Sequence, residues 1–587
     1  MENSSIKPFS YETFPASGLV AYFSMEIAIN PAMPTYSGGL GMLAGDTLRS
    51  AADLGVPLVA FTLAHRKGYF QQHLNGSGEQ SEEVQPWNPA DFCKEEPARI
   101  TVSVEDRIVT VRAWRYELVG RYGHVVPIYL LDTDLDGNSG WDRGLTDHLY
   151  GGDTNYRLQQ EIVLGMGGAR MANALGLTVN VYHMNEGHAA LLTLALLEGQ
   201  LGGGPLGAAT DSDIAQVRRK CVFTTHTPVP AGHDRFSMEQ SIRILGGDRA
   251  ARLEKLGCFH EGLLNMTLIA LRFSRYANGV AMQHGKVSRA MFPEFPVDSI
   301  TNGVHAPTWV SEPVQQMLDA HIPAWRRDNL YLRNAIDLPE QEILKTHVRA
   351  KEVLLAEVAS RTGLVLNPRV LTLGFARRAA TYKRASLLFT DPDRLLKIAT
   401  QAGGLQILYA GKAHPQDVPG KALIHDVIEV ARKLSNDVLR IVYLENYGWD
   451  LGALLTAGVD VWVNTPRRPY EASGTSGMKA ALNGVPSLSI LDGWWIEGCI
   501  EGFTGWAIED GANDAEEAVS LYNKLEKAVV PLYCDVPEKW GHLMRTTLAF
   551  NGSYFNTNRM VKQYTRNAYY PVHLLEPAKV EEPAYAH

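Results

Sequence analysis

The chain has 587 residues, of which 45% are hydrophobic and 20% are charged, and its formal net charge is −9. A single hydrophobic core does not grow to this length, so we expect a globular protein of about two to four domains. The negative charge argues against a general nucleic-acid binder. The five cysteines are few and scattered, which argues against a disulfide framework. No leader sequence and no apolar run of ~20 residues is present, which predicts a cytoplasmic protein without a membrane span.

Apolar strand-like runs alternate with helical stretches along most of the chain. An N-terminal arm, residues 1–17, precedes a first α/β section, residues 18–310, with strands expected within 18–26, 56–64, 125–133, 179–187 and 220–228 and a helix over 155–175. A helical connector over 311–365 leads to a second α/β section, residues 366–550, with strands expected within 369–376, 405–413, 438–446, 459–466 and 485–493. Residues 551–587 form a C-terminal segment and tail. Such alternation predicts βαβ units and parallel sheets, whose ligands gather at the carboxyl ends of the strands.

The run from Glu471 to Gly484, EASGTSGMKAALNG, is the most informative part of the chain. A small, glycine- and hydroxyl-rich turn leads into a helix that carries Lys479. Backbone amides of such a turn can approach an anion closely, and the helix N-terminus adds partial positive charge. A lysine there can form a Schiff base with an aldehyde cofactor. A surface loop that caps a helix is the alternative explanation for a short stretch of this kind.

The same run resembles, over about a dozen residues, the pyridoxal-phosphate attachment site of the glycogen/starch (α-glucan) phosphorylases. The resemblance covers roughly residues 18–550, and within the family it is to the short bacterial and archaeal members. It implies that Lys479 anchors pyridoxal 5′-phosphate and that Gly474 and Thr475 contact the cofactor. It also implies that Glu471, Ser473 and Gly474 bind hydroxyls of the donor glucose.

Four cations follow the strand expected at 369–376, in the segment Arg377-Arg-Ala-Ala-Thr-Tyr-Lys383-Arg384. At a strand end and beside an expected helix N-terminus, they predict a site for one or two phosphates. A solvated basic turn is the alternative. By resemblance, Arg377 faces the cofactor phosphate, Arg378 binds inorganic phosphate and Lys383 bridges the two. Ala380 stands where many family members carry histidine.

A glycine loop, Tyr36-Ser-Gly38-Gly39-Leu-Gly41, precedes another expected helix. Glycine spacing alone would also fit a dinucleotide loop, but no acidic residue ends a following strand in the expected context. By resemblance, Gly38 and Gly39 bring backbone amides next to the substrate phosphate. Met42 stands where animal family members have arginine.

Two histidine-containing segments, Thr225-His226-Thr227 and His183-Met-Asn-Glu186-Gly-His188, follow expected strands. Each histidine alone is more often a core residue than a catalyst, and the spacing is not that of a zinc site, so we expect no metal. By resemblance, His226 contacts the glucosyl unit at the cleavage point, and Glu186 and His188 line the glucan side. Asn302 would bond a sugar hydroxyl, and Tyr447 would lie near the cofactor, although both also fit ordinary turns.

The resemblance implies two Rossmann-like doubly wound α/β domains facing across a cleft, the GT-B glycosyltransferase architecture, and a possible homodimer. It implies reversible phosphorolysis of terminal α-1,4-linked glucose, with inorganic phosphate and an α-1,4-glucan as the partners and retention of configuration. Lys479, Arg378, Lys383 and His226 are the implied catalytic residues. A nucleotide-sugar-dependent glucan synthase and a non-catalytic glucan-binding relative are the alternatives. The presence of Lys479 argues against the first, and the presence of Arg378 and Lys383 argues against the second.

Overall fold

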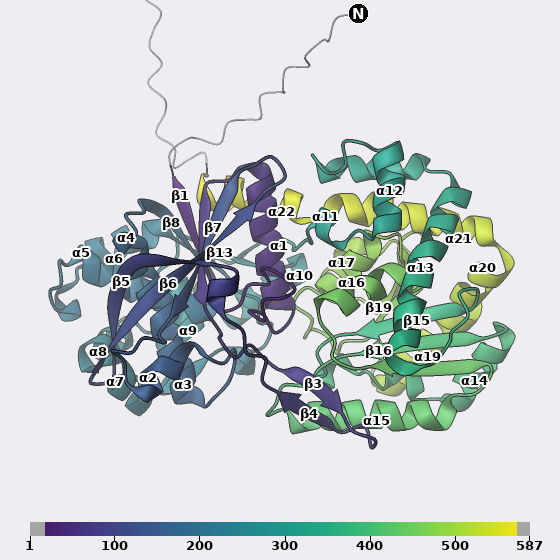
Figure 1. Ribbon diagram of the computed structural model, residues 1–587, viewed down its shortest axis with the longest axis horizontal. Coiled ribbons are helices and arrows are strands. Elements are labelled where there is room, and N and C mark those ends of the chain that lie inside the picture. Colours follow the sequence, from purple (N-terminus) through teal and green to yellow (C-terminus); the bar gives the residue numbers. More distant parts are fainter. Residues whose placement is uncertain (1–17, 572–587) are drawn as a thin grey trace, which may run out of the picture.

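The computed structural model describes residues 18–571 and contains two large sheets, seen side by side in Figure 1. The first has nine strands in the order β14-β13-β9-β8-β1-β2-β7-β6-β5. Its parallel part consists of β1 (Leu19–Ser24), β2 (Leu58–Leu63), β7 (Val125–Asp132), β8 (Val179–Asn185), β9 (Cys221–Thr224), β13 (Tyr276–Gly279) and β14 (Asp298–Ser299). The five strands expected in this section are therefore confirmed as neighbours in one parallel array.

One edge of this sheet differs from the expected all-parallel pattern. Strands β5 (Lys94–Val104) and β6 (Arg107–Val119) pair antiparallel with each other, and β6 pairs antiparallel with β7. Along β6, buried Val109, Val111 and Ala113 alternate with more exposed residues, because this edge of the sheet is covered on one face only. The long continuous apolar runs that mark buried parallel strands are absent from β5 and β6, so a search for such runs misses them.

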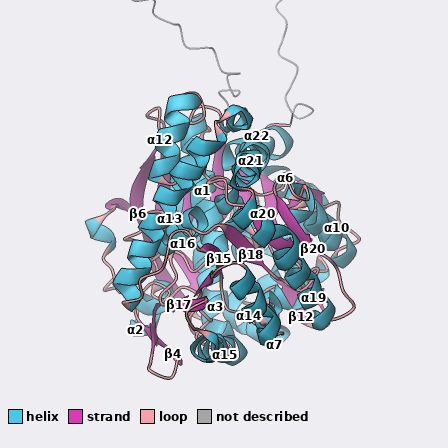
Figure 2. Cartoon of the chain, turned by 90° about the vertical axis from the view of Figure 1, so that its right-hand side faces the viewer, coloured by secondary structure: helices cyan, strands magenta, loops and turns pink. Residues whose placement is uncertain are grey.

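The second sheet has six strands, all parallel, in the order β17-β16-β15-β18-β19-β20. Five of them were expected from the sequence: β15 (Leu371–Ala376), β16 (Leu405–Ala410), β17 (Leu439–Leu444), β18 (Val461–Asn464) and β19 (Ser487–Ile490); β20 (Gly505–Ile508) was not. Helices α14 (Pro392–Gln401) and α19 (Asp514–Lys524) lie in front of this sheet in Figure 2, and they contact β16 and β20, respectively. The buried strand residues divide between two apolar clusters: Leu373 and Ile407 belong to the larger one, and Leu408 and Trp462 belong to the other.

Helix α11 (Ala306–Trp309) ends the first section, and the expected helical connector contains α12 (Glu312–His321), a 3-10 segment (Asn329–Asp337) and α13 (Glu340–Thr362). Helices α20 (Val530–Asp535) and α21 (Pro537–Thr547) follow the second sheet. Helix α22 (Thr557–Tyr564) then returns to α1 (Gly39–Leu54), and its buried side chains join one of the two apolar clusters of the first sheet. The N-terminal arm and the end of the C-terminal tail, residues 572–587, lie outside the described residues.

A small hairpin links the two halves of the structure near the bottom of Figure 1. Its strands β3 (Gln71–Leu74) and β4 (Gln80–Glu83) lie against α15 (Val418–Leu434). The buried Gln72 side chain donates to the Gly411 carbonyl at 2.9 Å, and Gln80 donates to the Ala413 carbonyl at 2.9 Å. These bonds join the first section to the loop after β16. Within residues 18–571, no helix is long and apolar enough to cross a membrane.

Candidate active site

The carboxyl ends of strands from both sheets open into one cavity of about 910 Å³. All fifteen residues to which the sequence assigned a role line it: Gly38, Gly39, Glu186, His188, His226, Asn302, Arg377, Arg378, Lys383, Tyr447, Glu471, Ser473, Gly474, Thr475 and Lys479. They come from segments separated by up to several hundred residues. The structure thus brings the predicted residues together in one place, while their individual roles stay predictions.

Lys479 lies in α17 (Thr475–Ala481), which begins directly after Gly474. Gly474 has φ +88°, a conformation that favours glycine, and it allows the chain to turn sharply from the cavity wall into the helix. The Lys479 Nζ atom lies 3.5 Å from the centre of the Trp309 ring. Burial lowers the pKa of this amine to about 8, and the negative charge of Asp46 opposes the shift only in part. The site therefore raises the fraction of neutral, nucleophilic amine near neutral pH.

Two of the predicted phosphate ligands share one carboxylate. Lys383 Nζ lies 2.6 Å from Glu471 Oε2, and Arg377 Nη1 lies 3.2 Å from the same oxygen. Burial raises the pKa of Glu471, but the charges of Lys383 and Arg377 outweigh this effect, and the net shift is downward. Arg378 lines the same cavity with an exposed side chain. The cavity therefore has a cationic end that contains one buried carboxylate.

The sequence predicted a helix N-terminus beside these cations, and this prediction is wrong. After β15 the chain forms only a 3-10 turn at Thr381–Lys383, and the next α-helix, α14, begins at Pro392. Arg384 leaves the turn with φ +48°, and its guanidinium donates to the carbonyls of Thr465 and Pro466. The side chain of Arg384 is thus used to anchor the turn, so three of the four clustered cations face the cavity.

The glycine loop does provide a helix N-terminus, because the sixteen-residue helix α1 begins at Gly39. The first amides of a helix have no partner within it and carry partial positive charge, which suits a phosphate. Glu26, just beyond β1, fixes the loop by accepting the amides of Ser37 at 2.6 Å and Gly38 at 3.2 Å. The Gly38 amide is therefore engaged by protein, and the next amides are the ones that point beyond the loop.

His226 lines the cavity from the first section, two residues after β9. Its backbone N–H donates to Glu186 Oε2 at 2.7 Å, and its Nε2 contacts Asn185 Oδ1 at 2.6 Å. An amide oxygen can only accept, so Nε2 carries the proton. Burial lowers the pKa of His226 to about 3, which keeps the ring neutral at physiological pH. His226 is therefore suited to hydrogen bonding and unsuited to acting as a cationic acid.

Glu186 has both carboxylate oxygens engaged. Oε1 accepts the Gly187 amide at 3.0 Å, and Oε2 accepts the His226 amide and the Thr227 hydroxyl. The residue has φ +73°, an uncommon conformation for a side chain with a Cβ, which these bonds stabilise. In this structure Glu186 holds the His226 segment in place. The sequence predicted only that Glu186 lines the glucan side of the site.

The cavity wall also contains buried polar atoms that make no hydrogen bond within the described part of the protein. Asn302 is 3% exposed, and its Oδ1 is buried without a hydrogen-bond partner among the described residues, as is the Ser473 hydroxyl. Buried polar groups are normally paired, so these atoms fit a polar ligand. His188 Nε2 lies 3.3 Å from Asp234 Oδ2. No group of three His, Cys, Asp or Glu side chains within residues 18–571 is arranged to hold a metal ion.

Glu26 and Trp309 are among the cavity residues that were not given a role from the sequence. Glu26 holds the glycine loop and also accepts the Tyr150 hydroxyl at 3.0 Å, while Trp309 covers Lys479. Glu26 follows an expected strand, in the run Phe23-Ser-Met-Glu26, and its position at a strand end is a signal that could have identified it. Trp309 lies at the end of α11, just before the connector, and no local pattern in the sequence relates it to Lys479.

Comparison with known proteins agrees with this geometry. The family profile described as carbohydrate phosphorylase matches residues 231–501. The maltodextrin phosphorylase of Thermococcus litoralis is 39% identical over 94% of this chain and 70% of its own length. The glycogen phosphorylase of Mycobacterium tuberculosis is 38% identical over 94% of this chain and 71% of its own, and that of Aquifex aeolicus is 34% identical over 94% and 86%. The chain belongs to the carbohydrate phosphorylase family.

Proposed function

We propose that this protein is an α-glucan phosphorylase that transfers the terminal α-1,4-linked glucose of a maltodextrin or glycogen chain to inorganic phosphate, with retention. One observation carries the proposal. A single cavity is lined by three cations, Arg377, Arg378 and Lys383, and also by a neutral histidine and by buried polar atoms that have no hydrogen-bond partner among the described residues. The cations suit phosphate, and the uncharged polar groups suit a neutral sugar.

The cationic end has to accommodate phosphate groups in a site of low dielectric constant, where like charges repel strongly. In this proposal Arg378, whose side chain is exposed in the cavity, binds inorganic phosphate with help from the N-terminus of α1. Arg377 and Lys383 contact phosphate directly, and Glu471, which pairs with both of them, binds hydroxyls of the donor glucose.

The residues around Lys479 fit pyridoxal 5′-phosphate. The amine is buried, its pKa is lowered to about 8, and it opens into the same cavity as Arg377 and Tyr447. Thr475 and the Gly474 turn line the adjoining wall. When bound through Lys479, the cofactor supplies a phosphate group that can hold or donate a proton beside the substrate phosphate. The protein supplies the anchor and the surrounding positive charge.

The leaving glycosidic oxygen needs a proton, and the protein side chains nearest to the sugar end are poorly suited to give it. His226 stays neutral at working pH because burial lowers its pKa to about 3. Both oxygens of Glu186 accept hydrogen bonds from its own segment and from His226 and Thr227. Inorganic phosphate has an ionisation near neutral pH, so the phosphate held by Arg378 is the better proton donor. Its oxygen then attacks the same face of the sugar.

We further propose two domains that face each other across a cleft, residues 18–310 and 366–550, joined by the connector over 311–365. The cavity has walls from both sheets, which supports this division. Exclusion of water by this enclosure would favour transfer to phosphate over hydrolysis. We also propose a homodimer, which only the family resemblance supports.

The decisive assay measures glucose 1-phosphate released from a ladder of maltooligosaccharides, with and without phosphate and with and without added pyridoxal phosphate. We expect product only when phosphate is present. Release without phosphate, or a colourless protein that uses a nucleotide sugar, would contradict the proposal.

Two variants separate the proposed roles within that assay. Lys479→Ala should lose cofactor and activity together. Arg378→Ala should keep the cofactor and weaken phosphate use by about 10²-fold in kcat/KM, the scale found when one charged transition-state contact is removed. An unchanged phosphate dependence in Arg378→Ala would refute the role of that residue.

A further inference from the structure

Asp46 is a buried carboxylate near Lys479, and the proposed reaction gives it no role. It lies in α1, the helix that begins at the glycine loop, and its side chain is 1% exposed. The residues before it on the helix, Met42, Leu43 and Ala44, are buried and apolar. A charge taken out of water needs compensating partners, and an apolar side chain would serve packing here equally well. The partners of Asp46 therefore indicate what the charge is for.

One oxygen of Asp46 is used by the segment that carries Trp309. Oδ2 accepts the indole N–H of Trp309 at 2.6 Å and the backbone N–H of His305 at 3.1 Å. An indole has a single N–H donor, so this bond fixes which way the ring is turned. Trp449 packs against the same ring with an interplanar angle of 27°. Asp46 thus sets the orientation of Trp309 within a closely packed aromatic pair.

The face of the Trp309 ring supports Lys479. The Lys479 Nζ atom lies 3.5 Å from the ring centre, where a cation is attracted by the electrons of the ring. Asn483 holds the same two residues through their backbones, because its Nδ2 donates to the carbonyls of Trp309 at 2.9 Å and Lys479 at 3.0 Å. The backbones of the two residues are thus fixed, and the ring orientation decides where the amine rests.

The other oxygen of Asp46 lacks a full partner. Oδ1 makes no hydrogen bond within residues 18–571 and lies 3.5 Å from Arg49 Nη1, on a guanidinium that also donates to two backbone carbonyls. The ring of His305 is paired with Asp53 at 3.0 Å. The remaining charge nearby is Lys479, whose pKa burial lowers and the negative charge of Asp46 raises. Asp46 is therefore the counter-charge of this amine.

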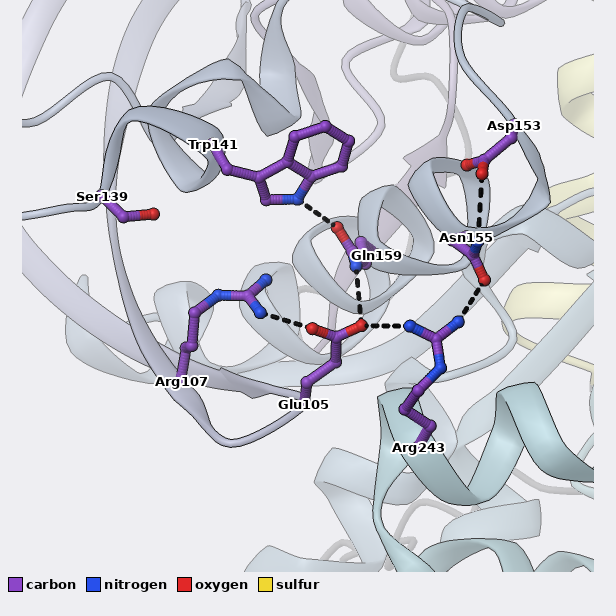
Figure 3. A pocket seen from close by; sticks show the side chains of 8 residues that line it. All are labelled: Glu105, Arg107, Ser139, Trp141, Asp153, Asn155, Gln159 and Arg243. Atoms are coloured by element: carbon purple, nitrogen blue, oxygen red, sulfur yellow. Dashed lines mark hydrogen bonds and ion pairs between the residues drawn. The ribbon is translucent and has the colours of Figure 1, made fainter.

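Glu105 offers a comparison within the same protein. In the pocket of about 390 Å³ drawn in Figure 3, Glu105 accepts Arg243 Nη1 at 2.8 Å and also pairs with Arg107. The Glu105 side chain is 19% exposed, so water reaches it as well. Asp46 is more deeply buried and has fewer charged hydrogen bonds. Its placement is thus less favourable for stability alone, which points to a role at the site.

We propose that Asp46 is the positioning residue of Lys479: it fixes the Trp309 ring on which the amine rests, and it supplies the negative charge that faces this amine. The consequence for cofactor binding rests on the proposed function, in which Lys479 anchors pyridoxal 5′-phosphate. An anchor that is held in one place before its ligand arrives loses less conformational entropy on binding.

The counter-charge is tested in the cofactor-free protein. Asp46→Asn keeps the shape and an oxygen acceptor for the indole but removes the charge. Reductive methylation of Lys479 at pH 7, followed by mass spectrometry, should become about fivefold faster, because losing one nearby negative charge commonly lowers the pKa of an amine by about 1. Asp53→Asn is the matched control, since Asp53 lies on the same helix and also acts on Arg49. It should be labelled at the wild-type rate.

The positioning is tested with Asp46→Ala, which also removes the hydrogen-bond acceptor. In ¹⁹F NMR of protein labelled with 5-fluorotryptophan, the signal missing from Trp309→Phe identifies Trp309. This signal should shift and broaden in Asp46→Ala and stay near its wild-type position in Asp46→Asn. The apparent Kd for pyridoxal 5′-phosphate, measured by absorbance titration, should rise about tenfold in Asp46→Ala, the scale of one lost charged hydrogen bond. It should stay near the wild-type value in Asp46→Asn.

A wild-type labelling rate in Asp46→Asn, or an equal increase in Asp53→Asn, would overturn the counter-charge. An unchanged Trp309 signal together with unchanged cofactor affinity in Asp46→Ala would overturn the positioning. If Asp46→Ala does not fold, Asp46→Asn still decides through the labelling of Lys479. If the wild type binds no pyridoxal 5′-phosphate and releases no glucose 1-phosphate, the proposed function fails, and the labelling of the cofactor-free protein still decides on Asp46.

Discussion

Lys479 shows at the residue scale how burial changes chemistry. Its pKa falls to about 8 from an ordinary value of 10.5 because the charged form is desolvated. The neutral amine is the reactive form, and half of it is present at about pH 8. In the cofactor-free protein, reductive methylation of Lys479 should therefore rise steeply up to about pH 8 and level off above it. Mass spectrometry of labelled peptides measures this, with exposed Lys397 as the reference site; a profile that still climbs above pH 10 would contradict the shift.

Glu471 makes a second residue-scale case, because it lies between two cations. Replacing it by glutamine leaves Lys383 and Arg377 buried without their counter-charge, which should lower the free energy of unfolding by about 3 kcal/mol in phosphate-free buffer. Added phosphate should restore part of the loss, because a ligand that binds only the folded state stabilises it. Urea denaturation with and without phosphate measures both effects, and an equal loss in both buffers would contradict the shared-anion role.

The sign of the pH effect for Glu471 follows from its lowered pKa. The folded state holds the carboxylate charged at pH values where the unfolded chain protonates it, below about 4.5. Its contribution to stability is thus complete above that pH and is lost as the pH falls further. Wild-type stability should drop more steeply than that of Glu471→Gln below pH 4.5, which denaturation curves over pH 3 to 6 would show.

At the scale of elements, helix α13 is fixed to the second sheet by a buried charge network. Asp460, which precedes β18, accepts His347 Nε2 at 2.9 Å and Lys351 Nζ at 2.5 Å, and all three side chains are nearly fully buried. Lys351→Met removes the lysine partner of the buried Asp460 and should lower the free energy of unfolding by about 3 to 5 kcal/mol. Lys345→Met, at an exposed position of the same helix, is the control. Equal stability of the two variants in urea denaturation would show that the network does not hold the helix.

At the scale of the whole molecule, the chain returns to the first sheet after completing the second. Tyr564 of α22 is buried, and its hydroxyl contacts Thr224 Oγ1 at 3.1 Å and Asn278 Nδ2 at 2.9 Å. Tyr564→Ala should lower the free energy of unfolding of the first section by about 3 to 5 kcal/mol, the usual range for a large buried ring. Tyr554→Ala, at a site 44% exposed, should have a much smaller effect. Hydrogen exchange in β8 and β9 reports the loss locally, and unchanged protection there would contradict this coupling.

The sequence by itself determined the alternation of strands and helices, because long buried runs and glycine-rich turns are local signals. It also predicted fifteen site residues that the structure brings together in one cavity, since polar residues at the ends of parallel strands meet at one edge. The edge strands β5 and β6 and the 3-10 turn before Arg384 were decided by tertiary structure, because half-covered strands lack a continuous apolar run and the turn is fixed by carbonyls of a distant loop. Contacts between residues far apart in the chain, such as Trp309 over Lys479 and Glu471 between Lys383 and Arg377, depend on which strands and helices become neighbours, and no spacing in the sequence specifies them.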